Sequence, residues 1–119
     1  MVTTLERFVE EELAAYRRAR AAGRREEAWA ALERAHILSQ PGPWLHTRVH
    51  LEMLRFGLAL GDWREVRGQV ARVAVAALGS GLGRAPAGNT GRATVPIMAV
   101  MPVPPEVEAK LAAARAEIR

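Results

Sequence analysis

His36, His46 and His50 are the only histidines of the 119-residue chain, and they lie close together in the sequence. Imidazole nitrogens are ligands for zinc, iron, nickel and copper. His46 and His50 are four positions apart, so on a helix they point to the same side and can bind one ion. A third imidazole from another helix, that of His36, would fix the geometry of the ion. We therefore predict that the three histidines converge on a metal.

Glu12 is the carboxylate that we expect to complete this site. Phe8 and Tyr16 flank it at helical spacing, which places Glu12 near the middle of an apolar stripe. A carboxylate on a core-facing position is costly unless it is paired, protonated or bound to metal. Three imidazoles and one carboxylate suit a tetrahedral zinc ion, so zinc is the first expectation, and iron, nickel or copper are the others. The predicted metal ligands are His36, His46, His50 and Glu12.

The role of the site depends on whether Glu12 binds the metal. Four protein ligands would close the site, which favours a structural or metal-handling role. Without Glu12, water would fill the open position, and hydrolytic chemistry would become available because a metal lowers the pKa of bound water. Glu12 or Glu33 would then be the general base. Glu33 and Gln40 are also candidates to orient an imidazole. The sequence leaves open whether the protein is an enzyme.

Other interpretations of the histidines remain open. They could form a buried hydrogen-bond network with Glu12 and no metal, or their helical faces could be assigned wrongly. The metal signal is also weaker than that of an H-E-x-x-H motif, because the spacing of His46 and His50 is common by chance. The alternative function is a helical interaction module that holds a partner helix or peptide in a groove between hairpins.

The spacing of apolar residues predicts the helices that must position these side chains. Turn residues separate the first four: Gly23, the run from Gln40 to Pro43, and Gly61. Two capping boxes are expected, one at Thr3 with Glu6 and one at Asp62 with Glu65. The predicted helices span residues 4–22, 25–39, 43–60, 63–78 and 105–118. The apolar face expected for the fourth helix consists of Trp63, Val66, Val70, Val73, Ala74 and Ala77.

Antiparallel packing of successive helices would bring the predicted ligands to similar heights. At a rise of 1.5 Å per residue, His36 lies about 6 Å from the turn at residues 40–43, and His46 lies about 5 Å from it on the other arm. If the first two helices pack antiparallel about the turn at Gly23, His36 lies opposite residue 10, which is within about one helical turn of Glu12. Matching faces and heights are therefore the reason to place four polar groups in one site.

The length suits one domain with one core. We expect an all-α protein, an up-down bundle or stack of helical hairpins with four to five helices and a faint tetratricopeptide-like spacing. The single domain would cover residues 1–119, with the bundle core at about 4–79, a Pro/Gly-rich loop and strap at 80–104, and a final helix at 105–118. Within the strap, residues 95–103 would pack Ile97, Met98 and Met101 onto the bundle, or else would grip a partner.

Composition limits the class of protein further. Half of the residues are hydrophobic and a quarter are charged, as in ordinary globular proteins. No apolar run approaches the roughly 18 residues of a membrane span, and the acidic, helical N-terminal segment does not resemble a signal peptide. The lack of cysteine excludes disulfides and thiolate ligands. We expect a cytoplasmic protein.

The net charge of +4 raises the question of nucleic-acid binding. The densest basic patch, between Arg17 and Arg25, lies beside two glutamates and has no aromatic residues spaced for base stacking. We interpret it as a solvated helix end and expect no nucleic-acid partner. A homodimer or another protein partner stays open, because the tryptophans Trp29, Trp44 and Trp63 could be core residues or could mark a dimer face.

Two stretches carry a resemblance to a known family. Residues 33–40 read E-R-A-H-I-L-S-Q, and residues 46–54 fit H-x-x-V-H-x-x-M-L. Together with G-D-W-R-E-V and G-N-T-G-R-A further on, they resemble a small bacterial family called domain of unknown function 3703, over about residues 5–105. The resemblance implies a grouping and no activity. We place its G-N-T-G-R-A stretch, residues 88–93, as a loop folded back over the histidine end.

Overall fold

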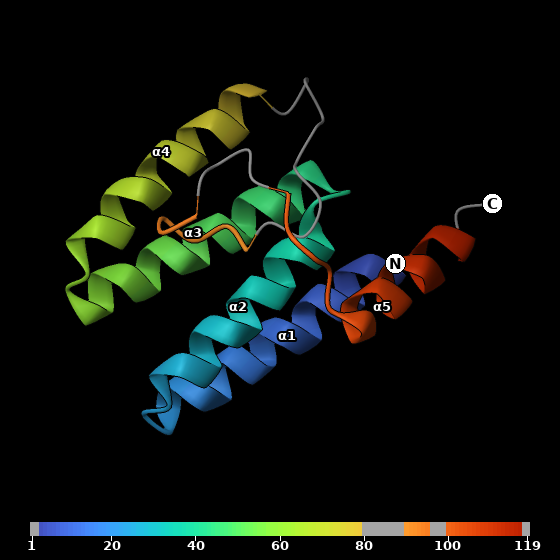
Figure 1. The fold of residues 1–119 in the computed structure, drawn as a ribbon, viewed down its shortest axis with the longest axis horizontal. Helices are drawn as coiled ribbons and strands as arrows, with labels where there is room; N and C mark the ends of the chain where they lie inside the picture. The colour runs from blue at the N-terminus through green and yellow to red at the C-terminus, as the bar shows by residue number, and fades with distance from the viewer. Residues whose placement is uncertain (1–2, 80–89, 96–99, 118–119) are drawn as a thin grey trace.

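The computed structural model describes residues 3–79, 90–95 and 100–117, and Figure 1 shows their arrangement. The helices are α1 (Thr4–Ala21), α2 (Arg25–Ser39), α3 (Pro43–Leu60), α4 (Trp63–Gly79) and α5 (Pro105–Glu117). Within the described residues there is no strand. Each observed helix end lies within one residue of the predicted end, so the prediction of an all-α protein is confirmed.

The helices form two antiparallel hairpins, α1 with α2 and α3 with α4 (Figure 1). The hairpins meet through α2 and α3, whereas α4 packs chiefly on α3 and lies at the outside of the bundle. The C-terminal helix α5 contacts both α1 and α2. Residues 90–95 lie between the two hairpins, where Figure 1 shows them in orange beside α3.

Local sequence signals explain where the helices begin and end. Before α1, the Thr3 hydroxyl accepts a hydrogen bond from the Glu6 N–H at 3.1 Å, and the Glu6 carboxylate accepts one from the Thr3 N–H at 3.2 Å. This is the predicted first capping box. Pro43 starts α3, where its missing N–H is not needed, and Gly61 ends α3 with a φ of 69°, a conformation that favours glycine. These signals fix the helix register around the histidines.

The apolar core lies between the first hairpin and the inner face of α3. Its largest buried members include Leu13, Tyr16, Leu32, Leu38, Val49 and Met53. Trp29 belongs to this core, because its ring packs on Phe56 with centroids 4.8 Å apart. Trp44 and Trp63 are exposed. The three tryptophans therefore do not share one environment.

The expected inner face of the fourth helix is wrong in part. Trp63 and Val70 are 64% and 53% exposed, and Val66 and Val73 are half-buried, whereas Glu65 and Gln69 are 1% and 0% exposed. Helix α4 thus turns a polar side inward. The physical reason is that Glu65 and Gln69 meet hydrogen-bond partners inside the fold, and this holds the helix in an orientation that its apolar residues alone do not select.

The C-terminal part of the chain returns to the first hairpin. Val103 packs against the core, Met101 is half-buried, and Val107 and Leu111 of α5 are buried in it. Ile97 and Met98, which were expected to pack onto the bundle, lie outside the described residues. The end of the predicted strap and the C-terminal helix are therefore part of the fold.

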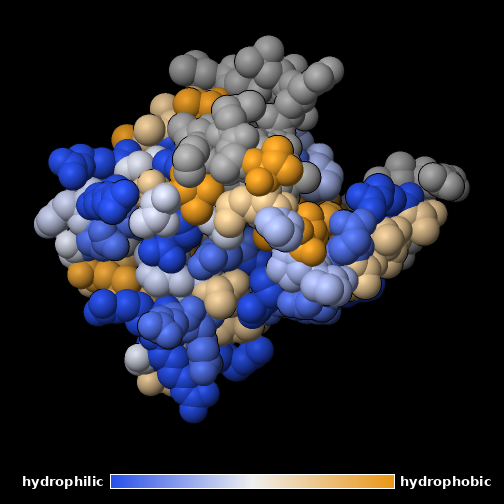
Figure 2. Space-filling model, viewed as in Figure 1, coloured by the Kyte–Doolittle hydropathy of each residue, from blue (hydrophilic) through white to orange (hydrophobic). Residues whose placement is uncertain are grey.

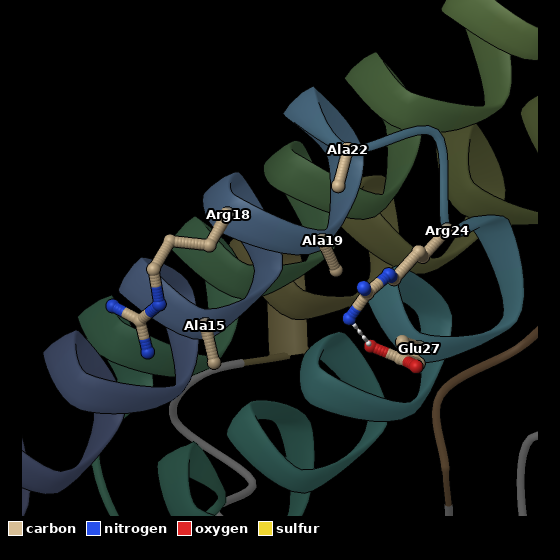
Figure 3. A pocket seen from close by; sticks show the side chains of 6 residues that line it. All are labelled: Ala15, Arg18, Ala19, Ala22, Arg24 and Glu27. Carbon is tan, nitrogen blue, oxygen red and sulfur yellow. Dashed lines mark ion pairs between the residues drawn. The ribbon is translucent and has the colours of Figure 1, made fainter.

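A shallow hollow of about 330 Å³ lies beside the turn between α1 and α2 (Figure 3). Arg24 and Glu27 form an ion pair there at 3.6 Å, and both side chains are exposed. The other residues around it are Ala15, Arg18, Ala19 and Ala22. His36 lies thirteen residues beyond Gly23 in α2, about 20 Å along the helix. The hollow is thus separate from the histidines, and its arginines are solvated as predicted for this helix end.

The described surface is mixed in character. On the face drawn in Figure 2, hydrophilic side chains cover most of the helices, and hydrophobic residues form small groups between them. Among the described residues, no helix combines the length and the apolar character that crossing a membrane requires.

Replacing Leu32 with alanine should lower the free energy of unfolding by about 2–5 kcal/mol, because buried methyl groups are lost and a cavity is left. Leu32 is 0% exposed, whereas Leu58 is 49% exposed. The matched change Leu58→Ala should therefore stay within about 0.5 kcal/mol of the wild type. Urea unfolding followed by circular dichroism measures both. Equal losses in the two variants would contradict the assignment of the core.

Candidate metal centre

The three histidines converge in the structure. The Nε2 atoms of His36 and His46 are 3.0 Å apart, and the Nε2 atom of His50 lies 3.1 Å from each of them. The ring centroids are 4.7–4.8 Å apart, so the rings point their Nε2 atoms toward a common centre. His36 and His50 are buried, and His46 is half-buried. Among the described residues, these three form the group that could hold a metal ion.

The triangle of nitrogen atoms has a size that suits a transition metal. A zinc ion binds imidazole nitrogen at about 2.0–2.1 Å. The three Nε2 atoms, 3.0–3.1 Å apart, are close enough together to bind one ion at that distance. Three histidines would leave one position of a four-coordinate ion open for a further ligand. A site with an open position is the arrangement from which metals activate water.

The turn between α2 and α3 positions these side chains. His36 lies in the last turn of α2, and His46 and His50 lie in the first half of α3. Because the turn is short and the two helices pack antiparallel, the imidazoles of His36 and His46 meet at the same height. This is the convergence that their spacing predicted.

The structure does not bring Glu12 to the histidines. Its buried carboxylate accepts a hydrogen bond from Arg34 Nε, and its Oε1 atom lies 3.8 Å from Lys110 Nζ. Pairing was one of the three ways in which a carboxylate at this position could be accommodated. The structure therefore gathers three of the four predicted ligands and places the fourth in an ion-pair cluster between α1, α2 and α5.

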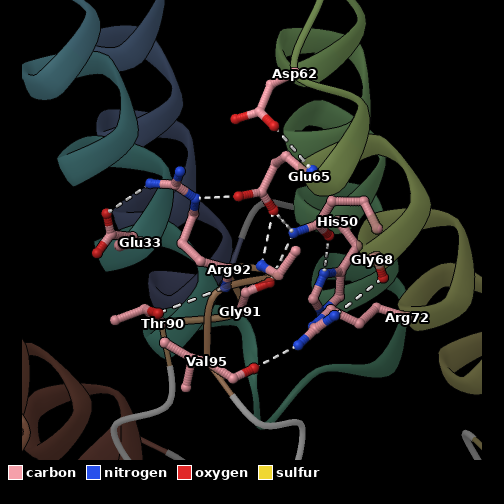
Figure 4. A network of polar contacts seen from close by, with 12 residues as sticks. Glu33, His50, Asp62, Glu65, Gly68, Arg72, Thr90, Gly91, Arg92 and Val95 are labelled. Atoms are coloured by element: carbon pink, nitrogen blue, oxygen red, sulfur yellow. Dashed lines mark hydrogen bonds and ion pairs between the residues drawn. The ribbon is translucent and has the colours of Figure 1, made fainter.

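A hydrogen-bonded group that the sequence analysis missed lies next to His50 (Figure 4). The Nδ1 atom of His50 is 2.8 Å from Oε1 of Gln69. The Gln69 amide nitrogen donates to Glu65 Oε2 at 2.8 Å and to the Gly91 carbonyl at 2.7 Å. Gln69 thus connects a histidine of α3 to the segment at residues 90–95.

The carboxylate of Glu65 is fully engaged by this segment. Its Oε2 atom accepts the Ala93 N–H at 2.8 Å, and its Oε1 atom accepts from Arg92 Nε. The Arg92 guanidinium also stacks 3.7 Å above the Trp29 ring and lies 3.6 Å from the Glu33 carboxylate. The network therefore joins α4 to α2 through one arginine.

Half of the second predicted capping box forms. The Glu65 N–H donates to Asp62 Oδ1 at 3.1 Å, but the Asp62 N–H donates to the Gly57 carbonyl at 3.0 Å. The Glu65 side chain accepts from Arg92, Ala93 and Gln69, as described above. Because the Glu65 carboxylate accepts these hydrogen bonds inside the protein, it does not cap the N-terminus of its own helix.

Gly91 lies against the imidazole of His36. A Cβ atom at this position would be 2.5 Å from His36 Cδ2 and 2.8 Å from its Nε2 atom, and the φ of Gly91 is +81°. Only glycine fits such a contact at such a φ without strain. Residues 90–93, the described part of the G-N-T-G-R-A stretch, thus lie over the histidine end as predicted.

The two residues expected to orient an imidazole have different surroundings. Burial raises the pKa of Glu33, while the charge of Arg92 opposes this rise. Gln40 is half-buried at the C-terminal end of α2. The residue whose contact orients His50 is Gln69, and the signal that could have found it is the four-residue spacing of Glu65 and Gln69 on one side of a helix.

Burial favours the neutral form of His46 and His50. It lowers the pKa of His46, and it lowers the pKa of His50 to about 4, although the hydrogen bond with Gln69 partly opposes this shift. A neutral imidazole retains a lone pair on one nitrogen, which is the form that binds metals. At neutral pH, His46 and His50 are therefore in the state that a metal requires.

The fold and the cluster together define an all-α protein of two helical hairpins with a histidine triad that could hold a metal ion. The family model described as "Protein of unknown function (DUF3703)" matches residues 3–111, which is most of the chain. The chain belongs to this family, and the resemblance seen in its sequence is confirmed. No curated protein and no solved structure matches the chain.

Replacing Gly91 with alanine should destabilise the protein more than the same change at Gly23. Both glycines have a positive φ, but a Cβ at Gly23 would meet nothing within 4 Å. Gly23→Ala therefore has a backbone cost of about 1 kcal/mol, and Gly91→Ala adds a clash with His36 of about 1–3 kcal/mol. Urea unfolding of both variants measures the difference. Equal losses of stability in the two variants would show that a Cβ atom at residue 91 does not clash with the imidazole of His36.

The metal-free protein should lose stability as the pH falls from about 6.5 toward about 4. His50 has an ordinary pKa of 6.5 when unfolded and a pKa of about 4 in the fold. Within this window the unfolded chain binds a proton that the folded chain does not, so acid favours unfolding by up to about 3 kcal/mol. Urea unfolding at a series of pH values measures it, and His50→Gln should show a shallower dependence. A stability independent of pH here would contradict a neutral His50.

Proposed function

We propose that the protein binds one transition metal ion, with zinc as the first candidate, through the Nε2 atoms of His36, His46 and His50. The observation that carries the proposal is the triangle of converging Nε2 atoms with sides of 3.0–3.1 Å. These separations are compatible with three nitrogen ligands at the ordinary zinc–nitrogen distance of about 2.0–2.1 Å.

A metal-free network explains the same triangle less well. Each neutral imidazole has one N–H, and that of His50 lies on Nδ1 if it donates to Gln69. At most two N–H groups then remain for three close nitrogen contacts. Moreover, the Nε2 atoms are 3.0–3.1 Å apart whereas the ring centroids are 4.7–4.8 Å apart, so all three Nε2 ends converge. A cation bound by the three Nε2 atoms would accept all three lone pairs at once, which supports metal binding over a hydrogen-bonded cluster.

The ligand chemistry restricts the choice of ion. Three neutral imidazoles suit zinc, copper, nickel or iron, whereas magnesium and calcium prefer oxygen. Because Glu12 is engaged by Arg34 and Lys110, we propose water or a small anion as the remaining ligand. The ion would keep its full positive charge, which favours such a ligand. We assign the protein a metal-binding role and no particular reaction.

Elemental analysis of the purified, tag-free protein is the direct test, together with zinc titration of the metal-free form. The wild type should bind about one equivalent, and His46→Ala should lose most of its affinity, because two imidazoles remain. Glu12→Gln should bind as the wild type does if the ligands are the three histidines. A Glu12→Gln variant with strongly reduced affinity would restore Glu12 as a ligand.

Thermal unfolding with and without a chelator separates this proposal from the alternative of a protein-interaction module. Metal bound to the folded state adds RT ln(1 + [L]/Kd) to its stability, so a chelator should lower the unfolding temperature of the loaded wild type but not that of His46→Ala. If the wild type takes up none of zinc, iron, nickel and copper, the proposal fails, and the histidines are core hydrogen-bonding groups.

A further inference from the structure

Gln69 is buried completely, and both partners of its amide nitrogen, Glu65 Oε2 and the Gly91 carbonyl, are hydrogen-bond acceptors. A backbone carbonyl can only accept, so the contact at 2.7 Å with the Gly91 carbonyl requires the amide nitrogen of Gln69 on that side. The contact at 2.8 Å with Glu65 Oε2 agrees, because Glu65 also receives donors from Arg92 and Ala93. A carboxylate that receives three N–H donors is ionised and accepts only.

The orientation of the amide determines the tautomer of His50. With its nitrogen directed at Glu65 and Gly91, Gln69 presents its oxygen to His50 Nδ1 at 2.8 Å. That oxygen can only accept, so Nδ1 must carry the proton. In the neutral ring, Nε2 then has the lone pair, and Nε2 is the atom that lies 3.0–3.1 Å from the other imidazole nitrogens within the triad.

The partners of Gln69 are themselves held in place. Arg92, which donates to Glu65, is fixed between the Trp29 ring and the Glu33 carboxylate. Figure 4 shows this row of contacts running from α2 across residues 90–95 to His50. Reversal of the Gln69 amide would direct its oxygen at two acceptors, and both contacts would become repulsive. The amide therefore has one orientation.

We propose that Gln69 is a positioning residue of the metal centre, which holds His50 in the Nδ1–H tautomer and thereby presents the Nε2 lone pair to the ion. The inference that Gln69 positions a metal ligand rests on the proposed function. The inference about the tautomer of His50 does not, because it follows from the hydrogen bonds of Gln69 alone. When the hydrogen-bond partner of a metal-binding histidine is removed, the affinity of the site for its metal typically falls by about 10–100-fold.

Nitrogen NMR of the metal-free protein tests the tautomer directly, since a protonated and an unprotonated ring nitrogen differ widely in chemical shift. His50 of the wild type should carry its proton on Nδ1. Gln69→Met has a similar length but accepts no such bond, so His50 should become a mixture of tautomers. Gln69→Glu keeps an oxygen for Nδ1 and, with its other oxygen protonated against Glu65, should retain the wild-type tautomer.

Zinc titration of the same variants tests the consequence for binding. Gln69→Met should bind zinc about 10–100-fold more weakly than the wild type, and Gln69→Glu should recover most of the loss. The control is Arg72→Met, which removes hydrogen bonds to the carbonyls of Gly68 and Val95 but no contact of Gln69. It loosens the same segment, and because it also removes a positive charge that acts on His50, it should bind zinc no more weakly than the wild type.

The outcomes separate this inference from the proposed function. A wild-type His50 protonated on Nε2, or a Gln69→Met variant with unchanged zinc affinity, would overturn the inference while the metal site stood. An equal loss in Gln69→Met and Arg72→Met would also overturn it, because the effect would then come from the segment as a whole. Absence of zinc binding in the wild type would remove the function, with the tautomer measured independently.

Discussion

The ionised carboxylate of Glu65 is the constraint on which the surroundings of the histidines depend. Removing such a group from water is costly unless hydrogen bonds and an opposite charge replace the lost hydration. Glu65 is 1% exposed and receives N–H donors from Gln69, Arg92 and Ala93. All three donors must be in place at once. The segment at residues 90–95 therefore has to lie between the hairpins, with α4 rotated to face it.

This constraint explains why the orientation of α4 could not be read from its apolar residues. Their spacing predicted that Trp63 and Val70 lie inside, but the helix is rotated so that Glu65 and Gln69 lie inside and Val66 and Val73 are half-buried. The partners of the polar side come from about 22 to 28 residues further along the chain, where no helical pattern indicates them. Within the described residues, no buried side-chain nitrogen or oxygen lacks a hydrogen bond, so the inward polar side is satisfied.

Helix limits and the histidine triad were predictable, because both depend on short-range signals. Proline and glycine mark the turns, and the distance of His36 and His46 from one turn sets their relative height. The partner of Glu12 was harder to predict, because a helical wheel identifies a buried face but not the residue that compensates a charge there. Arg34, its partner on α2, is twenty-two residues away and occupies a position that looks like ordinary helix surface.

The contacts among the proposed ligands join residues that are closer in the sequence than the contacts that orient His50. His36 and His50 are 14 residues apart in the sequence and lie on successive helices, whereas Glu65 and Ala93 are 28 residues apart. Contacts between residues close in sequence form sooner, because less chain entropy is lost in closing the loop. The three imidazoles can therefore meet while the rest of the chain is still unfolded or unsynthesised. An ion bound by the paired helices α2 and α3 would be enclosed afterwards, when residues 90–95 pack beside it and fix the orientation of His50.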